Sequence, residues 1–164
     1  MFKINEYIMY GNVGVCQVVD ISQEKFSNSI KREYYVLNPV NSKNTVIKIP
    51  VDNKIIAMRK VLSKEDIGLL INDIDNLEVF FIENERERNA QFKSMLKTGK
   101  CEDLFTIIKS LHSDKKIQKS LGKKLSKGDD EIMQTAEKLL NEEFAFVLDI
   151  LPEEVPNYIK ETVK

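Results

Sequence analysis

The first sixty residues alternate between short apolar runs and polar turns, a pattern that is typical of β-strands. The clearest pair of runs, residues 34–37 and 45–49, flanks a polar stretch at residues 41–44. Two strand-like runs around a polar turn predict a β-hairpin with a loop of more than two residues. Because side chains alternate along a strand, Ile49 and Lys48 should point to opposite faces, with Lys48 on the open face or edge.

A single β-hairpin is only marginally stable in water, so this one needs neighbouring strands. The chain offers three further strand-like runs, at residues 7–10, 13–21 and 54–58, together with a polar loop at residues 23–29. Five short strands in about sixty residues predict a small antiparallel sheet or barrel of the SH3/Tudor kind. Such barrels usually bind partners, although a β-domain without a partner is the alternative interpretation.

After residue 60 the apolar spacing changes to that of helices. Ser63 and Asp66 predict the capped start of a first helix. Two further helices are expected over residues 83–97, ending at Gly99, and over residues 102–112. The charged surface of these segments and their apolar stripes are typical of a soluble helical domain.

The longest amphipathic stretch follows Ser126 and extends to about Leu151, which predicts a helix that forms the spine of this half. Pro152 is expected to open a final helix, because proline suits the first helical position. The predicted fold class is therefore α+β. A small SH3/Tudor-like antiparallel β-barrel at residues 1–60 precedes an all-α domain of about five helices at residues 61–164.

Composition restricts the classes of function. Of the 164 residues, 42% are hydrophobic and 31% are charged, which is typical of a globular protein. No apolar run is long enough to cross a bilayer, and the first residues do not resemble a signal peptide, so a cytoplasmic location is expected. Two distant cysteines, Cys16 and Cys101, and one histidine form no recognisable zinc site. With no phosphate-binding loop and no catalytic triad pattern, we expect no cofactor, no metal and no enzymatic activity.

The net charge of −1 conceals an uneven distribution of charge along the chain. Residues 115–127 hold six lysines and no acidic residue, whereas residues 128–164 are strongly acidic. A run of lysines is often only a solvated face, but a run of a single sign favours contact with phosphates. The lysines taken as candidate DNA contacts are Lys115, Lys116, Lys119, Lys123 and Lys124.

Several short motifs, in their order and spacing, resemble the CarD family (CarD/CdnL) of bacterial transcription regulators. They comprise residues 10–15 (YGNVGV), 33–37 (EYYVL), 46–53 (VIKIPVDN), 96–99 (LKTG), 125–126 (LS) and 136–145 (AEKLLNEEFA). The first domain also resembles the polymerase-interacting domain of the transcription-repair coupling factor. The resemblance implies a monomeric, non-enzymatic regulator associated with the nucleoid.

The same resemblance implies what each half binds. The Tudor-like domain would bind the β subunit of RNA polymerase through its sheet edge, with Lys25, Arg32 and Lys48 as basic contacts. The helical domain would lie on promoter DNA at the upstream edge of the transcription bubble and stabilise the open complex. It would contact the minor groove and phosphates with little sequence specificity.

The resemblance implies DNA-contacting roles for three further residues. Phe81 falls where the family has a wedging tryptophan, a residue type that this chain lacks, and apolar side chains do act as wedges. Arg86 and Arg88 lie near the family's phosphate contacts. Because acidic residues at 129–131 replace a basic position of the family, the lysines of 115–127 should supply most phosphate contacts, and binding should be sensitive to salt. The alternative is a Tudor/SH3-like adaptor that binds proteins and not DNA.

Overall fold

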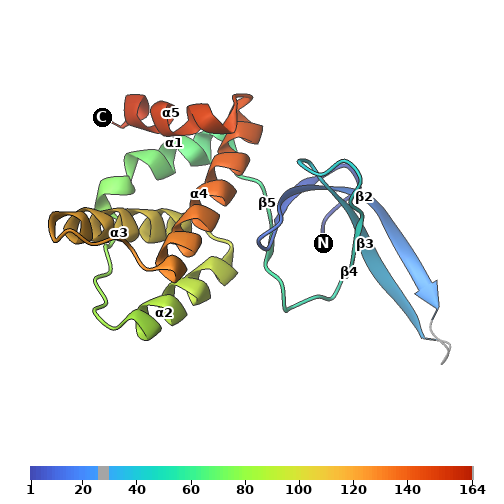
Figure 1. The fold of residues 1–164 in the computed structure, drawn as a ribbon. Helices are drawn as coiled ribbons and strands as arrows, with labels where there is room; N and C mark the ends of the chain where they lie inside the picture. The colour runs from blue at the N-terminus through green and yellow to red at the C-terminus, as the bar shows by residue number, and fades with distance from the viewer. Residues whose placement is uncertain (26–29, 164) are drawn as a thin grey trace. The chain divides into compact units, whose positions relative to one another are not determined.

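The structure, a computed structural model, describes residues 1–25 and 30–163 (Figure 1). It contains two compact units, Met1–Val61 and Leu62–Lys164, which we call the sheet unit and the helical unit. In the described residues a five-stranded antiparallel sheet is followed by five α-helices and two short 3-10 turns. This confirms the predicted α+β fold class, and the sheet is consistent with a Tudor-like β-domain.

The sheet has the strand order β4-β3-β2-β1-β5, so β4 and β5 are its two edges. All neighbouring strands are antiparallel. A β-bulge between Val18 and Asp20 increases the local twist of β2. The strands are β1 (Tyr7–Tyr10), β2 (Gly14–Lys25), β3 (Lys31–Pro39), β4 (Ile47–Pro50) and β5 (Met58–Lys60).

One face of the sheet carries the apolar core of this unit, which includes Ile8, Cys16, Val18, Tyr35 and Leu37. The predicted hairpin is confirmed as β3 and β4, with Ile49 buried and Lys48 exposed as alternation required. Strands β2 and β3 continue past the end of β4 as a two-stranded ribbon (Figure 1).

Two predictions for the sheet unit were inaccurate. The last strand covers Met58–Lys60 and not residues 54–58, because Asn53 stabilises a turn there: its Oδ1 accepts hydrogen bonds from the backbone N–H groups of Ile55 (3.0 Å) and Ile56 (3.2 Å). In the predicted loop at residues 23–29, the first three residues belong to β2, and the last four lie outside the described residues.

In the helical unit, α4 contacts each of the other four helices, which confirms its role as the spine (Figure 1). The rings of Phe105 and Phe144 pack edge to face between α3 and α4, with centroids 5.8 Å apart. The elements are α1 (Lys64–Asn72), η1 (Ile74–Asn76), α2 (Glu85–Thr98), α3 (Cys101–Ser120), α4 (Lys127–Leu148), η2 (Pro152–Glu154) and α5 (Val155–Thr162).

Local signals predicted several helix ends correctly. Ser63 and Asp66 form a capping box at the start of α1, and Gly99 ends α2 with a φ of 69°. The predicted end of the third helix near His112 was wrong, because α3 continues to Ser120. Residues 113–120 include three lysines and one glutamine, which favour helix, so part of the lysine run is helical. Pro152 opens a 3-10 turn, and α5 begins at Val155.

Candidate functional site

The β4 strand forms an edge of the sheet, and within the described part of the sheet unit it pairs only with β3. Val46, which precedes β4, is 62% exposed, and Lys48 on the strand is exposed as well. An edge strand presents N–H and C=O groups that can pair with an extended segment of another protein. The β4 edge is therefore a candidate for strand addition by a partner.

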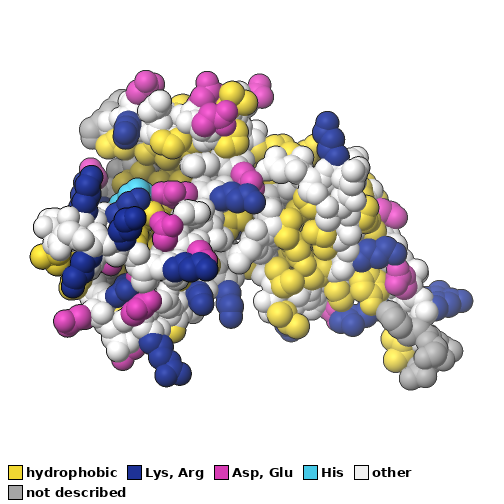
Figure 2. All heavy atoms as spheres, viewed as in Figure 1, with side chains coloured by type: hydrophobic (Ala, Val, Ile, Leu, Met, Phe, Trp, Pro, Cys, Tyr) yellow, Lys and Arg dark blue, Asp and Glu magenta, His cyan; other side chains and the backbone are white. Residues whose placement is uncertain are grey.

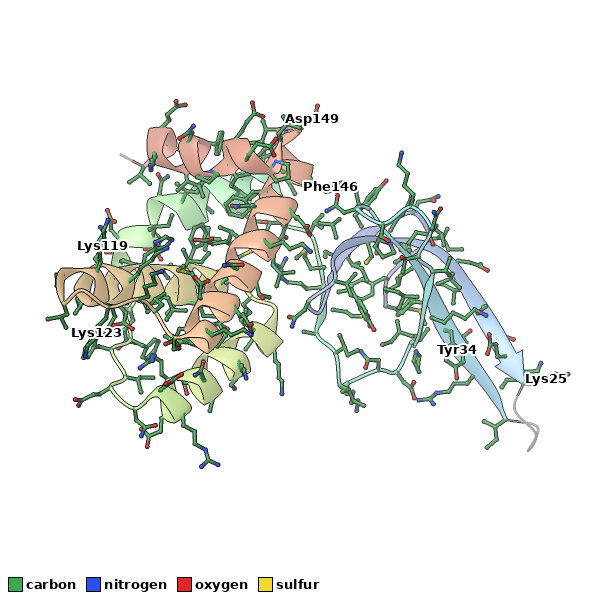
Figure 3. The ribbon with its side chains drawn as sticks, viewed as in Figure 1. Lys25, Tyr34, Lys119, Lys123, Phe146 and Asp149 are labelled. Carbon is green, nitrogen blue, oxygen red and sulfur yellow. The ribbon has the colours of Figure 1, made fainter. Side chains whose placement is uncertain are left out.

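The predicted polymerase contacts are distributed over both faces of this sheet. Lys48 donates a hydrogen bond to Glu24 (Nζ to Oε1, 2.6 Å), and this bond raises the pKa of Lys48. The strand register places Arg32 on the same face as these two residues, and Arg32 forms an ion pair with Asp52 (3.1 Å). Lys25 lies at the end of β2 (Figure 3), and the strand register places it on the opposite face. The structure thus brings Lys48 and Arg32 to one face and separates Lys25 from them.

In the helical unit, the predicted lysines gather where α3 ends and the chain turns into α4. Lys119 ends the helical part of this group and Lys123 follows in the loop (Figure 3). A hollow of about 690 Å³ opens there, whose lining includes Lys115, Lys119, Lys123, Lys124 and Lys127. We call these five residues the lysine hollow. Lys116 lies on α3 outside the lining but is also exposed.

The five lysines of this hollow outnumber the acidic residue Asp130, which also lines it. Among the described residues, Lys115, Lys119, Lys123 and Lys124 form no ion pair, while Lys127 is 4.0 Å from Glu131. Figure 2 shows Lys and Arg side chains spread over this part of the unit. Clustered ammonium groups attract a polyanion such as a nucleic acid backbone, and the attraction weakens as salt increases.

Phe81 lies in the apolar segment before α2, and its side chain is 72% exposed. Two adjacent phenylalanines before a helix are most often core residues, and this sequence-based expectation is wrong for Phe81, whereas Phe80 is half-buried. Exposing a large ring to water is unfavourable by the hydrophobic effect. An isolated exposed ring is compatible with contact to an apolar surface such as a nucleobase.

The two predicted arginines have different environments. Arg86 is exposed on α2. Arg88 is held by the carboxylate of Asp129, and its side chain is only 13% exposed. The hydrogen bond to Asp129 raises the pKa of Arg88 further. The geometry therefore favours a structural role for Arg88 over contact with phosphates.

The environment of Asp129 also changes the expected electrostatics of the unit. Its carboxylate is fully buried and neutralised by Arg88, so it does not oppose an anion at the surface. Sequence reasoning missed this pair, as well as Lys109 and Ser110 of α3, which bind the backbone before α2. The available signal was the presence of two adjacent polar residues within the apolar pattern of α3.

Other classes of site find no support in the described residues. No group of three or more potential metal ligands occurs among them. No helix in the described part of the chain is long and apolar enough to span a membrane. Both cysteines are buried thiols that are not part of a disulfide, and burial raises the pKa of Cys16 to about 11.

Comparison with known proteins identifies the sheet unit. Residues 2–62 match the family model of the CarD-like/TRCF RID domain, an RNA polymerase-interacting domain. The match covers almost all of the sheet unit and ends at the start of the helical unit. No curated protein matches the chain.

Proposed function

We propose that the chain regulates transcription by holding RNA polymerase and promoter DNA at the same time. The proposal proceeds from the domain at residues 2–62, which makes the chain a CarD-like family member. The sheet unit would bind the β subunit of the polymerase. The helical unit would contact DNA at the upstream edge of the bubble and stabilise the open complex. This role is non-catalytic and needs a coupling between the two sites of only about 1–3 kcal/mol.

The family match is the observation that carries the polymerase half of this proposal. The exposed β4 edge supports it, because strand addition supplies backbone hydrogen bonds without a preformed pocket. Lys48 lies on this edge and would meet the partner segment directly. Its ion pair with Glu24 leaves the pair close to neutral, so shape and backbone pairing would contribute more than charge.

Capture of the purified polymerase β subunit by the full chain tests this half. Lys48→Glu replaces the cationic partner of Glu24 with a second carboxylate at the β4 edge, and we expect the charge repulsion to weaken capture. Lys54→Glu is the matched control, since Lys54 is exposed in the same unit and precedes β5. Equal capture by both variants would contradict the assignment of the β4 edge.

The DNA half rests on the lysine hollow and on the exposed ring of Phe81. The lysines would neutralise phosphates, while Phe81 would pack against an unstacked base step in the minor groove. Binding of this kind reads the shape of melted DNA more than its sequence.

The lifetime of open complexes on one slow-opening promoter tests the DNA half. We expect the protein to prolong this lifetime, and Phe81→Ala and charge reversal at Lys115, Lys116 and Lys119 to remove most of the effect. Val79→Ala is a control in the same segment, because Val79 is apolar and partly exposed at 42%. Promoter kinetics that are indifferent to Phe81→Ala and to the lysine reversals would instead favour a protein-binding adaptor that does not bind DNA.

A further inference from the structure

The segment that carries Phe81 has no helix or strand, yet side chains of two helices bind its backbone on both sides of that residue. It comprises residues 77–84, between η1 and α2. Backbone polar groups in such a segment need partners, and water would serve for an exposed loop. Here three side chains, from Lys109, Ser110 and Arg88, take that place.

Lys109 binds the start of the segment. Its ammonium group, Nζ, donates to the carbonyl oxygens of Ile74 (3.0 Å), Asp75 (3.1 Å) and Leu77 (3.1 Å). An ammonium group has three N–H donors, so these bonds use all of them. Lys109 therefore joins the end of η1 to α3 and leaves no donor for an external phosphate.

Ser110 binds the residue immediately before Phe81. Its hydroxyl oxygen accepts a hydrogen bond from the backbone N–H of Phe80 at 2.9 Å. Ser110 is only 2% exposed, so water does not compete freely for this bond. Phe80 is thus fixed against α3, while the ring of the next residue remains in solvent.

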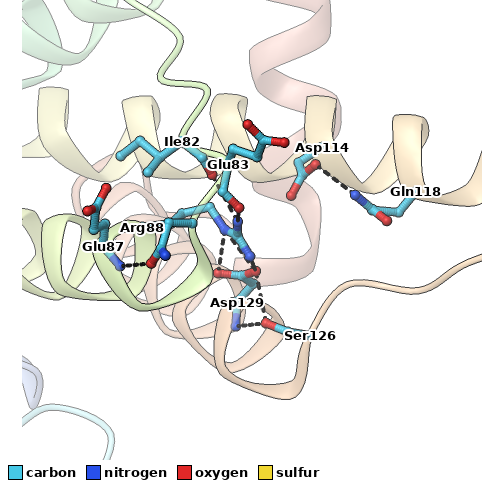
Figure 4. Close-up of polar contacts among 9 residues, drawn as sticks. Ile82, Glu83, Glu87, Arg88, Asp114, Gln118, Ser126 and Asp129 are labelled. Atoms are coloured by element: carbon cyan, nitrogen blue, oxygen red, sulfur yellow. Dashed lines mark hydrogen bonds and ion pairs between the residues drawn. The ribbon is translucent and has the colours of Figure 1, made fainter.

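Arg88 binds the residues immediately after Phe81 (Figure 4). Its Nη1 donates to the carbonyl oxygens of Ile82 (2.9 Å) and Glu83 (3.3 Å). Its Nε donates to both carboxylate oxygens of Asp129 (3.1 and 3.0 Å), and Nη2 also contacts that carboxylate. Ser126 in turn donates to Asp129 at 2.9 Å, which fixes the carboxylate at the start of α4.

These contacts explain how Phe81 stays exposed. A mobile segment would let the ring fold onto nearby apolar surface, because that removes it from water. With Leu77 and Phe80 held before it, and Ile82 and Glu83 held after it, the backbone cannot make this movement without breaking several hydrogen bonds. Binding then requires little further ordering of the segment.

We propose that Arg88, Lys109 and Ser110 are positioning residues that hold residues 77–84 in one conformation and present Phe81 to its binding partner. Arg88 then acts on the protein's own backbone and does not contact phosphates. The inference rests on the proposed function only for the identity of the partner, promoter DNA. The restraint on Phe81 is a property of the free protein and can be tested without DNA.

The first experiment uses Phe81→Trp as a reporter, since the chain has no other tryptophan and the position is exposed. In that background we expect Ser110→Ala and Lys109→Met to lower the residual fluorescence anisotropy of the introduced tryptophan. Ser94→Ala and Lys93→Met, both at exposed positions on α2, are the matched controls and should leave it unchanged. Lys109→Arg retains cationic donors and should restore part of the restraint.

Equal anisotropy in the Lys109 and Ser110 variants and in their controls would overturn the inference, whatever the protein binds. Circular dichroism must show native helix content for each variant. Ser110→Ala removes a single hydroxyl and therefore keeps the test valid if a Lys109 variant fails to fold.

The second experiment separates positioning from phosphate contact. Arg88→Gln combined with Asp129→Asn removes both charges of the buried pair, and DNA affinity is then measured over a series of salt concentrations. Replacing a positioning residue lowers affinity but leaves the slope of log K against log salt unchanged, whereas removing a phosphate-binding cation reduces the slope by about 0.9. Lys119→Gln serves as the comparison and should reduce the slope. A reduced slope in the Arg88 variant would overturn this part of the inference.

The two proposals fail in distinguishable ways. If the anisotropy results are as expected but no variant changes the open-complex lifetime, the segment is held as inferred and the proposed function is wrong. If the protein prolongs the lifetime and Phe81→Ala removes the effect, but anisotropy is the same in all variants, the proposed function stands and the positioning role is wrong.

Discussion

The two units differ in where their charged residues are paired. In the sheet unit the core is apolar, and the basic residue Lys48 is paired with Glu24 at the surface. In the helical unit a complete ion pair, Arg88 with Asp129, is buried, while four of the five lysines of the hollow form no ion pair in the described residues, although Asp130 also lines the hollow. A surface of paired charges suits recognition by shape and backbone pairing. A surface of unpaired lysines suits a polyanion.

The largest effect is expected from breaking the buried pair of the helical unit. Arg88→Met leaves the buried carboxylate of Asp129 without a cationic partner, and we expect a loss of about 3–5 kcal/mol of unfolding free energy. Urea unfolding followed by circular dichroism, which reports mainly helix, measures the loss. Arg88→Met combined with Asp129→Leu should recover most of it, since an apolar pair can replace a buried ion pair. A loss below about 1 kcal/mol in the single variant would show that water reaches the carboxylate.

The second prediction concerns the unpaired lysines. Replacing Lys119, Lys123 and Lys124 with glutamine should reduce the slope of log K against log salt for DNA binding, by about 0.9 for each phosphate that is no longer neutralised. The same replacement at Lys64, Lys93 and Lys97, which are exposed elsewhere in the helical unit, is the control. Polymerase binding should change little with salt, because the β4 edge carries paired charges. Similar slopes for both partners would remove the contrast between the units.

The third prediction concerns how stability depends on pH through Cys16 in the apolar core of the sheet unit. Burial raises the pKa of Cys16 from 9.0 to about 11, so the unfolded chain loses this proton at lower pH than the folded chain. The resulting stability is present in full below pH 9.0 and is lost as pH rises towards about 11. Burial also raises the pKa of Tyr10 in the same core, so Cys16→Ala is needed to isolate the thiol. Denaturant unfolding should show that Cys16→Ala loses less unfolding free energy than the original protein as pH rises. Identical dependence of the unfolding free energy on pH in the two proteins would contradict the prediction.

The smallest effect is expected from exchanging the charges of the surface pair. Lys48→Glu combined with Glu24→Lys keeps an ion pair between β4 and β2, whose side chains are 53% and 39% exposed in the original pair. We expect an unfolding midpoint close to that of the original protein, because exposed pairs contribute little to stability. Capture of the β subunit by this variant then shows whether the partner recognises the backbone of the β4 edge or the position of the positive charge. A large loss of stability would show that this pair is more than a surface contact.

Sequence could predict the features whose partners lie close along the chain. The capping box of Ser63 and Asp66 and the end of α2 at Gly99 each depend on a few consecutive residues. Alternation likewise predicted that Lys48 is exposed and that Ile49 is buried. These signals follow from the periods of helices and strands, and they carried most of the fold.

The contacts that define the candidate site depend on distant residues and were not predictable in this way. Arg88 and Asp129 are 41 residues apart, and Lys109 reaches carbonyl groups 32 to 35 residues earlier in the chain. Glu85 lies three residues before Arg88, a spacing at which helical side chains can pair, but the tertiary fold offers Arg88 the buried carboxylate of Asp129. The roles of exposed residues such as Lys25 and Arg86 stay predictions, since no packing fixes them.

The continuation of α3 to Ser120 has a consequence for how its lysines meet an anion. Lys115, Lys116 and Lys119 project from backbone that is already ordered, whereas Lys123 and Lys124 lie in the loop before α4. Ordering the backbone of a flexible residue costs about 1–2 kcal/mol in lost entropy. The helical lysines avoid that cost and need to restrict only their side chains, so the first three should form the firm part of any anion contact. In the loop, the backbone N–H of Lys123 already donates to the carbonyl of Gln118 (2.8 Å), so Lys124 should be the adaptable part.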